Sequence, residues 1–224
     1  MNAQKRALLL VGSPKGPKST SESLGNYLLE QLHKRGLHTE KVRINTSLKS
    51  DKGQEELLLA VDISDLLILS FPLYVDSLPS SMIRAMELIA KHRKAIENPK
   101  KQQLLAISNC GFPEAHHNDT ALAICRRFAL ESGLEWIGGL GLGGGAAIDG
   151  KPLNDLKGMV RNVKKSLDLT AAAIAEDKLV PKEAADLMAK PLISTWVYLL
   201  LGNFGWKRQA KKNSVLKEIH AQPY

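Results

Sequence analysis

A short segment near the N-terminus carries the residue types that bind phosphate. Residues 12–22 read Gly-Ser-Pro-Lys-Gly-Pro-Lys-Ser-Thr-Ser-Glu, between a short apolar run at residues 6–12 and a helical pattern at residues 20–35. The first N–H groups of a helix have no partner inside the helix, and the helix dipole adds positive potential there. Such a helix start binds anions. The polar candidates for contact with a phosphate are Ser13, Lys15, Lys18, Ser19, Thr20 and Ser21.

Three interpretations of this segment compete. Ser19 and Glu22 have the spacing of a capping box that binds nothing, but a box leaves the other hydroxyls and the lysines unexplained. Lys18 and Ser19 match the end of a nucleotide-binding P-loop, yet Pro17 stands where that motif needs glycine. The apolar run at residues 66–69 is also followed by Ser70 instead of an aspartate for magnesium. The third interpretation is a metal-free loop of hydroxyls and amides of the kind that holds the phosphate of FMN.

The elements that must position this segment alternate regularly. Continuous apolar runs indicate strands buried on both faces, and leucines at four-residue spacing indicate amphipathic helices. An alternation of strands and helices predicts a doubly wound α/β fold with a parallel sheet, whose ligands sit beyond the C-terminal strand ends. We expect strands at residues 6–12, 38–44, 65–71, 103–109 and 134–145, and helices at residues 20–35, 54–61, 79–93, 118–131 and 153–175.

Two further loops follow expected strands. After the third strand comes Pro72-Leu73-Tyr74-Val75, leading to a helix that opens near Pro79, and after the fourth comes Asn109-Cys110-Gly111-Phe112. Together with the first loop, these motifs give residues 5–180 a sequence that resembles the NAD(P)H-dependent FMN reductases and quinone reductases of the flavodoxin-like superfamily. The resemblance implies a five-stranded parallel sheet in the order 2-1-3-4-5.

The resemblance also implies an activity. FMN would be the cofactor and NAD(P)H the co-substrate of an oxidoreductase that passes hydride on to a quinone, a nitro or azo compound, or free flavin. No side chain is expected to be catalytic, because the flavin carries the chemistry. Members of the family are commonly dimers with the active site at the subunit interface. The implied cofactor-binding residues are Ser13, Lys15, Ser19, Thr20, Ser21, Pro72, Leu73, Tyr74, Val75, Asn109, Cys110, Gly111 and Phe112.

Two other functions stay open. A flavodoxin-type one-electron carrier would dock a protein partner and use no nicotinamide, although such carriers are typically smaller and acidic. A binding module could retain the fold and have lost the flavin. A flavin spectrum that responds to NAD(P)H separates the reductase from both.

Several other patterns favour ordinary structural roles. Residues 139–144 match G-x-G-x-x-G, but they end a strand and no suitably spaced acidic residue follows, so we interpret the glycines as packing positions. A second hypothesis is that they form the floor of the substrate pocket. His116 and His117 lack partner carboxylates at useful spacing, so we expect no metal site. Cys110 has no neighbouring base in the sequence and is interpreted as a small side chain.

Composition limits the class of protein. The chain has 224 residues, with 44% hydrophobic and 24% charged residues, which excludes intrinsic disorder. Two cysteines make no disulfide framework, and the first apolar run is too short for a signal peptide, so a cytoplasmic location is expected. The net charge of +8 is read as scattered surface lysines. We expect a small-molecule acceptor as partner, and contact with neither nucleic acid nor membrane.

The C-terminal part differs in composition from the rest. We expect a flavodoxin-like, FMN-binding domain at residues 1–180 and a helical appendage at residues 181–224. Two of the three tryptophans lie in the appendage, on an expected apolar helix. An aromatic helix of this kind is expected to pack on the domain or on a second subunit. The alternative is binding to a membrane surface through Trp196, Trp206 and the basic run at residues 207–212.

Overall fold

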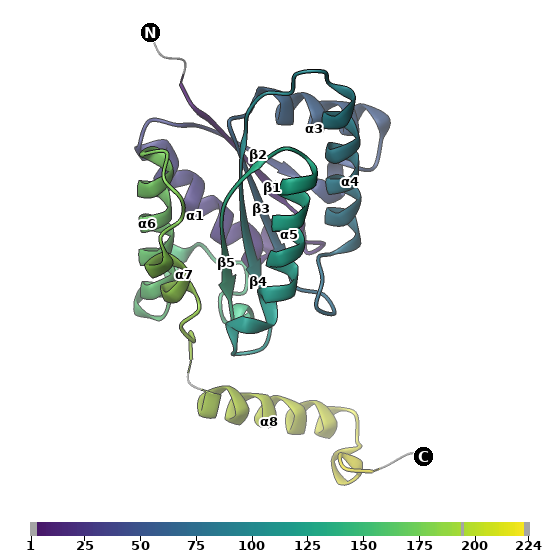
Figure 1. Ribbon diagram of the computed structural model, residues 1–224. Coiled ribbons are helices and arrows are strands. Elements are labelled where there is room, and N and C mark those ends of the chain that lie inside the picture. Colours follow the sequence, from purple (N-terminus) through teal and green to yellow (C-terminus); the bar gives the residue numbers. More distant parts are fainter. Residues whose placement is uncertain (1–3, 194, 222–224) are drawn as a thin grey trace. The chain divides into compact units, whose positions relative to one another are not determined.

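The computed structural model describes residues 4–193 and 195–221. Its centre is one sheet of five parallel strands in the order β2-β1-β3-β4-β5, as the sequence predicted (Figure 1). A loop leads from β1, β3, β4 and β5 to a helix or a helical turn, whereas β2 runs directly into a short helix at Ile44. The strands are β1 (Arg6–Val11), β2 (His38–Arg43), β3 (Leu66–Pro72), β4 (Gln103–Asn109) and β5 (Glu135–Leu142).

Helices cover both faces of this sheet. On one face pack α1 (Thr20–Lys34), α6 (Arg161–Ala175) and α7 (Lys182–Met188). On the other lie α3 (Asp51–Ile63), α4 (Ser80–Ala95) and α5 (Asp119–Glu131), with the short α2 (Ile44–Ser47) beside α3. The alternation of side chains in β1 shows why two cores form: Leu9 enters the first core, and Leu8 and Leu10 enter the second.

The three loops singled out in the sequence lie at one edge of the sheet. Strand β1 has β2 on one side and β3 on the other, so the chain winds in opposite directions from β1. In open α/β sheets this reversal leaves a crevice at the C-terminal strand ends, where ligands bind. The loops after β1, β3 and β4 all begin there.

Two expectations from the sequence need correction. The expected helix at residues 153–175 is broken, because Lys157 has φ 47° and interrupts the 3₁₀ segment Leu153–Val160, which precedes α6. The chain also divides later than residue 180, into compact units at 1–192 and 193–224. Helix α7 belongs to the first unit because it buries Ala184, Leu187 and Met188 there.

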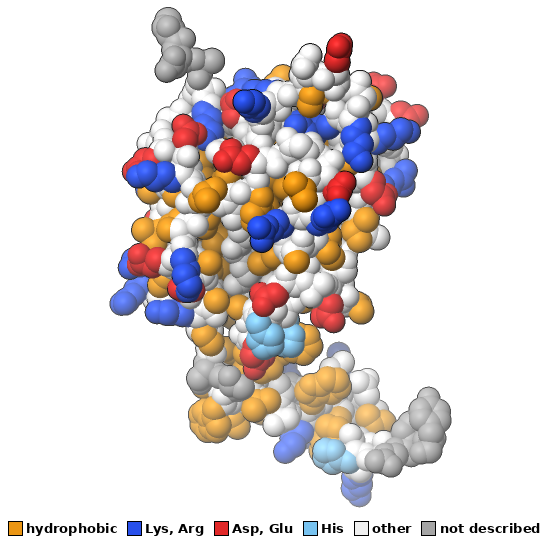
Figure 2. Space-filling view, viewed as in Figure 1, with side chains coloured by type: hydrophobic (Ala, Val, Ile, Leu, Met, Phe, Trp, Pro, Cys, Tyr) orange, Lys and Arg blue, Asp and Glu red, His pale blue; other side chains and the backbone are white. Residues whose placement is uncertain are grey.

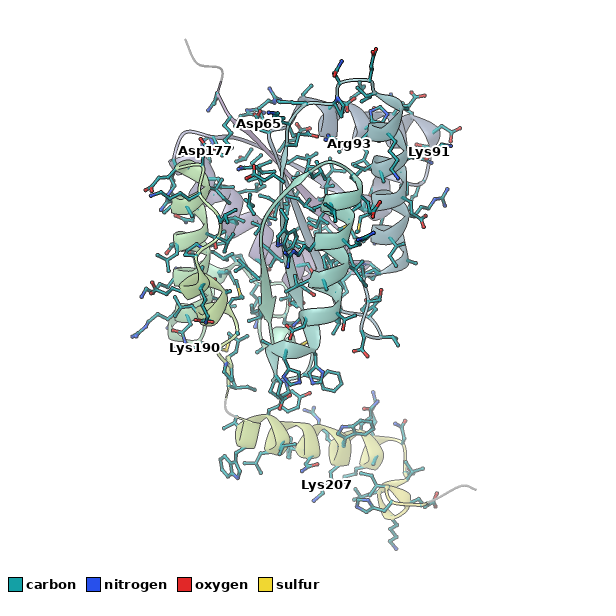
Figure 3. The ribbon with its side chains drawn as sticks, viewed as in Figure 1. Asp65, Lys91, Arg93, Asp177, Lys190 and Lys207 are labelled. Atoms are coloured by element: carbon teal, nitrogen blue, oxygen red, sulfur yellow. The ribbon has the colours of Figure 1, made fainter. Side chains whose placement is uncertain are left out.

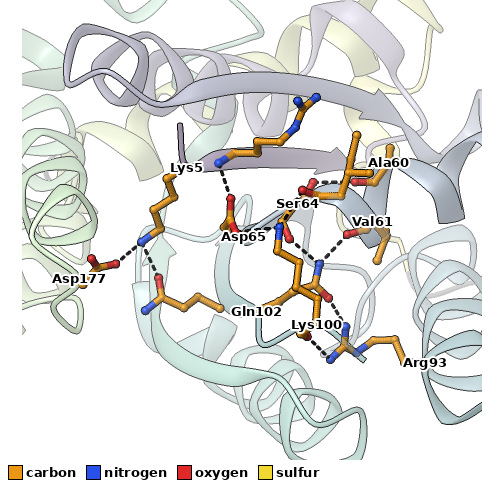
Figure 4. Close-up of polar contacts among 12 residues, drawn as sticks. Lys5, Ala60, Val61, Ser64, Asp65, Arg93, Lys100, Gln102 and Asp177 are labelled. Carbon is orange, nitrogen blue, oxygen red and sulfur yellow. Dashed lines mark hydrogen bonds and ion pairs between the residues drawn. The ribbon is translucent and has the colours of Figure 1, made fainter. Parts of the chain in front are cut away.

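A polar network joins the elements at the opposite, N-terminal ends of the strands (Figures 3 and 4). The buried Arg93 guanidinium donates to the carbonyl oxygens of Lys100, Ser132 and Gly133 and to the side chain of Gln102. Burial lowers the pKa of this guanidinium. The network fastens the ends of α4 and α5 to the start of β4, far along the strands from the three loops.

The second unit contains α8 (Thr195–Lys212) and a 3₁₀ turn, Leu216–Glu218. The N–H of Val215 donates to the carbonyl of Ala210 (2.9 Å), and Ala210 is buried. No helix among the described residues combines the length and the hydropathy that crossing a bilayer requires.

Candidate functional site

The first loop joins β1 to α1 and is held at its end by Ser19. Ser19 is the N-cap of α1, and its hydroxyl accepts the N–H of Glu22 (3.2 Å). The Glu22 carboxylate does not return to the Ser19 N–H as in a full capping box. It binds Lys41 (2.7 Å) and Arg43 (2.6 Å) on the neighbouring strand β2. Only half of the capping box is therefore formed.

The ion cluster around Glu22 determines the charge beneath the loop. Burial raises the pKa of Glu22, but hydrogen bonds from Arg43 and Lys41 outweigh it and the pKa ends below its usual value. The carboxylate is ionised at neutral pH and balanced by two cations. The cluster carries a net positive charge, so Glu22 presents no uncompensated negative charge to an anion at the helix start.

Hydroxyl groups of the first loop keep protons to donate. Ser19 accepts from the Glu22 N–H, Ser21 accepts from the Asn109 side chain (2.8 Å), and Ser13 accepts weakly from the Lys15 N–H (3.4 Å). Each hydroxyl has one proton, and none of the three donates it to another of the described residues. A phosphate oxygen is the acceptor that such a set suits. The Thr20 hydroxyl differs, because it already donates to the Gly145 carbonyl (2.8 Å).

Asn109 ties the three loops together. Its buried amide donates to the Ser21 hydroxyl and to the Phe71 carbonyl (3.0 Å). The main-chain carbonyl of Asn109 accepts a hydrogen bond from the Leu73 N–H (2.8 Å). Ser70 adds a hydrogen bond from its hydroxyl to the Ser21 carbonyl (2.7 Å). The start of α1 is thus fixed to the ends of β3 and β4 without any ligand.

The second loop ends in a tight turn. Tyr74 and Ser77 exchange two main-chain hydrogen bonds (2.9 and 3.1 Å), and between them Val75 and Asp76 have φ 48° and 56°. A β-branched residue in the left-handed region is strained, and such strain is concentrated at functional sites. Val75 is 98% exposed, so its side chain stands at the tip of the loop.

The third loop surrounds a protected thiol. Asn118 is buried, accepts the Ser108 hydroxyl (2.7 Å) and donates toward the Cys110 sulfur (3.5 Å). Burial raises the pKa of the Cys110 thiol, the opposite of an activated nucleophile. The Cys110 N–H donates to the Leu142 carbonyl (2.9 Å), so it is not available to a ligand.

Most of the predicted residues surround one cavity of about 170 Å³. Two predicted residues are not in its wall: Val75 at the tip of its turn, and Phe112, which is 58% exposed and stacks on His117 with ring centres 4.7 Å apart. Whether the cavity holds a cofactor stays a prediction. The predicted residues that line it are Ser13, Lys15, Ser19, Thr20, Ser21, Pro72, Leu73, Tyr74, Asn109, Cys110 and Gly111.

A fourth loop, after β5, completes the wall. The sequence suggested the glycines at residues 139–144 as a pocket floor, but the two lining residues that follow them were missed. Gly145 and Ala146 line the cavity, and the N–H of Gly145 donates to the Cys110 carbonyl (2.8 Å). The preceding Gly144 has φ 66°, and a Cβ on Gly143 would collide with the Pro113 carbonyl. The run of glycines directly after a strand was the available signal, because it allows the chain to turn under the third loop.

A larger hollow, about 520 Å³, lies at the opposite ends of the strands. Its charged groups are mostly paired with one another: Lys5 binds Asp177 (2.6 Å) and Lys100 binds Asp65 (2.8 Å). These ion pairs link neighbouring elements and leave few groups free for a ligand. We therefore place the candidate site at the C-terminal strand ends, in agreement with the rule for open α/β sheets.

The strand order and the loops at the switch point define a flavodoxin-like fold. No protein-family model and no curated protein matches the chain. Among solved structures, the chain is similar to an FMN-dependent NADH-azoreductase from Bacillus anthracis in complex with FMN, with 13% identity and a TM-score of 0.53 over 76% of this chain and 100% of that one. It is also similar to RosB with a bound riboflavin-phosphate derivative, with 15% identity and a TM-score of 0.56 over 90% and 87%.

A third similar structure is a WrbA-like flavodoxin protein from Agrobacterium tumefaciens, with 12% identity and a TM-score of 0.53 over 78% of this chain and 99% of that one. At these identities the likeness concerns the fold. Function must be argued from the site itself.

Proposed function

We propose that the chain binds FMN non-covalently at the cavity and acts as an NAD(P)H-dependent oxidoreductase. The observation that carries the proposal is the convergence of loops from four parallel strands around one cavity, with unused hydroxyl protons at the start of α1. FMN has a phosphate ester at one end and a planar ring at the other. The hydrogen-bond donors at the start of α1 suit the phosphate ester, and the apolar residues of the loop after β3 suit the planar ring.

Each loop has a part in this proposal. Ser13, Ser19 and Ser21 would donate to the phosphate, and Lys15 would add charge. Pro72, Leu73 and Tyr74 would meet the ring. The chemistry that bound FMN supplies is uptake of a hydride from NAD(P)H and delivery of the electrons to a second acceptor, which we propose is a quinone, a nitro or azo compound, or free flavin.

The chain itself would contribute orientation and electrostatics. The raised pKa of Cys110 keeps the thiol protonated, so no side chain in the cavity wall is proposed as a nucleophile. The Cys110 N–H is already paired, which leaves the Gly111 N–H as the donor we propose for negative charge on the reduced ring. Asn109 would keep the loops in register.

The size of the cavity bears on assembly. Whole small-molecule pockets commonly enclose roughly 300–1,000 Å³, and this one encloses about 170 Å³. It suffices for part of an FMN. We propose that a second copy of the chain supplies the remaining wall in a homodimer.

The test is a visible absorption spectrum of the purified chain supplied with FMN, before and after anaerobic NADH and, separately, NADPH. A bound flavin spectrum that bleaches supports the reductase and identifies the donor. A bound flavin that ignores both nucleotides favours a one-electron carrier. Failure to bind FMN contradicts the proposal.

A matched pair of lysines tests the phosphate position. Lys15 lines the cavity and Lys18 does not, although both are exposed on the same loop. Removing one exposed charge near a phosphate costs up to about 1 kcal/mol, or about five-fold in affinity. Lys15→Gln should therefore weaken FMN binding about five-fold in a fluorescence titration, while Lys18→Gln stays within about two-fold. Equal effects would contradict the assigned phosphate position.

A further inference from the structure

The second unit carries apolar side chains that it cannot bury itself. The chain after α8 folds back on the end of the helix and buries Ala210. This contact does not bury the apolar side chains on the earlier turns of the helix. A unit of this size has too little volume for a core of its own. The large side chains left between 49% and 70% exposed are Trp196, Leu199, Leu200, Phe204 and Trp206. Figure 2 shows hydrophobic side chains gathered along the visible face of α8.

Charge on α8 is separated along its axis. Residues 196–206 contain no acidic or basic residue, and Lys207, Arg208, Lys211 and Lys212 follow directly (Figure 3). The segment 193–224 has five Lys or Arg residues and one Glu, so its net charge is +4. Since the whole chain carries +8, residues 1–192 also carry +4. Pairing of α8 with α8 of a second copy would therefore bring positive charge toward positive charge, whereas the homodimer proposed at the cavity need not involve α8.

We propose that α8 binds the surface of an anionic lipid bilayer, with residues 196–206 among the upper acyl chains and the cationic turns at the headgroups. Tryptophan favours this interface, and Lys and Arg are attracted to anionic headgroups. The eleven apolar-segment residues extend about 16 Å, roughly half the hydrocarbon thickness of about 30 Å. The helix therefore enters one leaflet at an angle and does not cross. The sequence favoured packing on the domain or on a second subunit and left this membrane contact as the alternative.

The inference does not depend on the proposed flavin chemistry, because none of its residues lines the cavity. The full-length chain is mixed with phosphatidylcholine vesicles or with mixed phosphatidylcholine–phosphatidylglycerol vesicles, and the bound fraction is measured by sedimentation. Tryptophan emission is recorded in parallel. We expect binding to the mixed vesicles, a shift of the emission to shorter wavelength, and release by salt.

Two variants and one control locate the contact. The first variant combines Trp196→Ser with Trp206→Ser. The second replaces the four basic residues Lys207, Arg208, Lys211 and Lys212 by Gln. Each variant should lower the partition coefficient at least ten-fold. The control removes four exposed lysines from the first unit and should lower it less than about two-fold; it replaces Lys49, Lys52, Lys91 and Lys94 by Gln. Circular dichroism melting verifies that each variant is folded.

Three results would overturn the inference. The first is no binding to mixed vesicles. The second is binding that the control reduces as much as the α8 variants do. The third is a dimer in light scattering that the double tryptophan variant dissociates, or tryptophan emission already at short wavelength without vesicles; these would assign the face to a second copy or to the chain's own first unit.

Discussion

Gly150 supports the back of the first loop, and its replacement tests whether that loop holds phosphate. Gly150 has φ 69°, and a Cβ at this position would lie 2.8 Å from the Cα of Lys18 and closer still to its carbonyl group. These are main-chain atoms, so no flexible side chain can move aside. Gly150→Ala must therefore displace the loop that leads into Ser19.

The expected cost has two parts. A left-handed alanine costs about 1–2 kcal/mol relative to glycine. Ordinary contact begins at 3.4 Å and the Lys18 carbonyl carbon and oxygen would lie at 2.3 Å, so the Lys18 main chain must also retreat by about 1.1 Å. A shift of that size weakens hydrogen bonds whose useful range spans only about 0.5 Å. We expect FMN affinity to fall ten- to hundred-fold, which corresponds to about 1.4–2.8 kcal/mol.

Gly133→Ala is the matched control, because Gly133 has φ 63° and a Cβ there meets nothing within 4 Å. Chemical denaturation should show a larger loss of unfolding free energy for Gly150→Ala than for Gly133→Ala. The difference between the two losses measures the cost of the collision with Lys18. FMN titration should show a weakened site only for Gly150→Ala. If Gly150→Ala binds FMN as tightly as the unmodified chain, the first loop does not hold the phosphate.

Three further outcomes are expected. Arg93→Met should lower the free energy of unfolding by about 2–4 kcal/mol, because it leaves buried carbonyls without donors, yet leave FMN affinity unchanged; denaturation and titration together check this, and an equal loss in both would refute the separation of the two ends. Because the folded pKa of Glu22 lies below its usual 4.5, its contribution to stability is present above that pH and is lost as pH falls through the folded value. Glu22→Gln should flatten the acid arm of a melting-temperature profile, and an unchanged arm would exclude this source. Burial raises the pKa of both cysteines, to about 12 for Cys125, so a thiol reagent should label neither rapidly until the chain is denatured; Cys110→Ser should keep NAD(P)H-dependent bleaching.

The sequence was sufficient to predict the sheet and the position of its loops. The strands at β1, β3 and β4 are continuous apolar runs, which only a sheet covered on both faces accommodates. A parallel sheet brings the C-terminal ends of all strands to one edge. Loops separated by about 40 to 60 residues in sequence were therefore expected to meet, and the structure brings them together.

Contacts between distant polar residues could not be predicted. Glu22 has the spacing of a capping box with Ser19, but Lys41 and Arg43 on β2 take its carboxylate. Nothing in local sequence reveals which side chains the adjacent strand presents. The same limit applies to α7, whose seven residues are too few for a clear helical period, although Ala184, Leu187 and Met188 are buried.

The direction in which side chains point on loops could not be predicted from the sequence either. Val75 and Phe112 lie within motifs that suggest contact with a ligand; both are largely exposed and outside the cavity wall, and their contact with a cofactor stays a prediction. Loop backbones adopt φ values that depend on the turn, and one left-handed residue reverses the direction of a side chain. The lining residues of the fourth loop were missed for a related reason, since glycines contribute through the main chain and offer no side chain to recognise.

The hydrogen bonds among the loops explain how a site can form before any cofactor arrives. Ser21 and Asn109 join the first and third loops, and Thr20 and Gly145 join the first and fourth. The entropy of ordering these loops is lost during folding, so binding need not supply it again. The three serine hydroxyl oxygens accept hydrogen bonds from the main chain or from Asn109, and each hydroxyl retains a proton that it can donate. A polar set that is ordered in advance and still has protons to donate is what recognition of a phosphate ester requires.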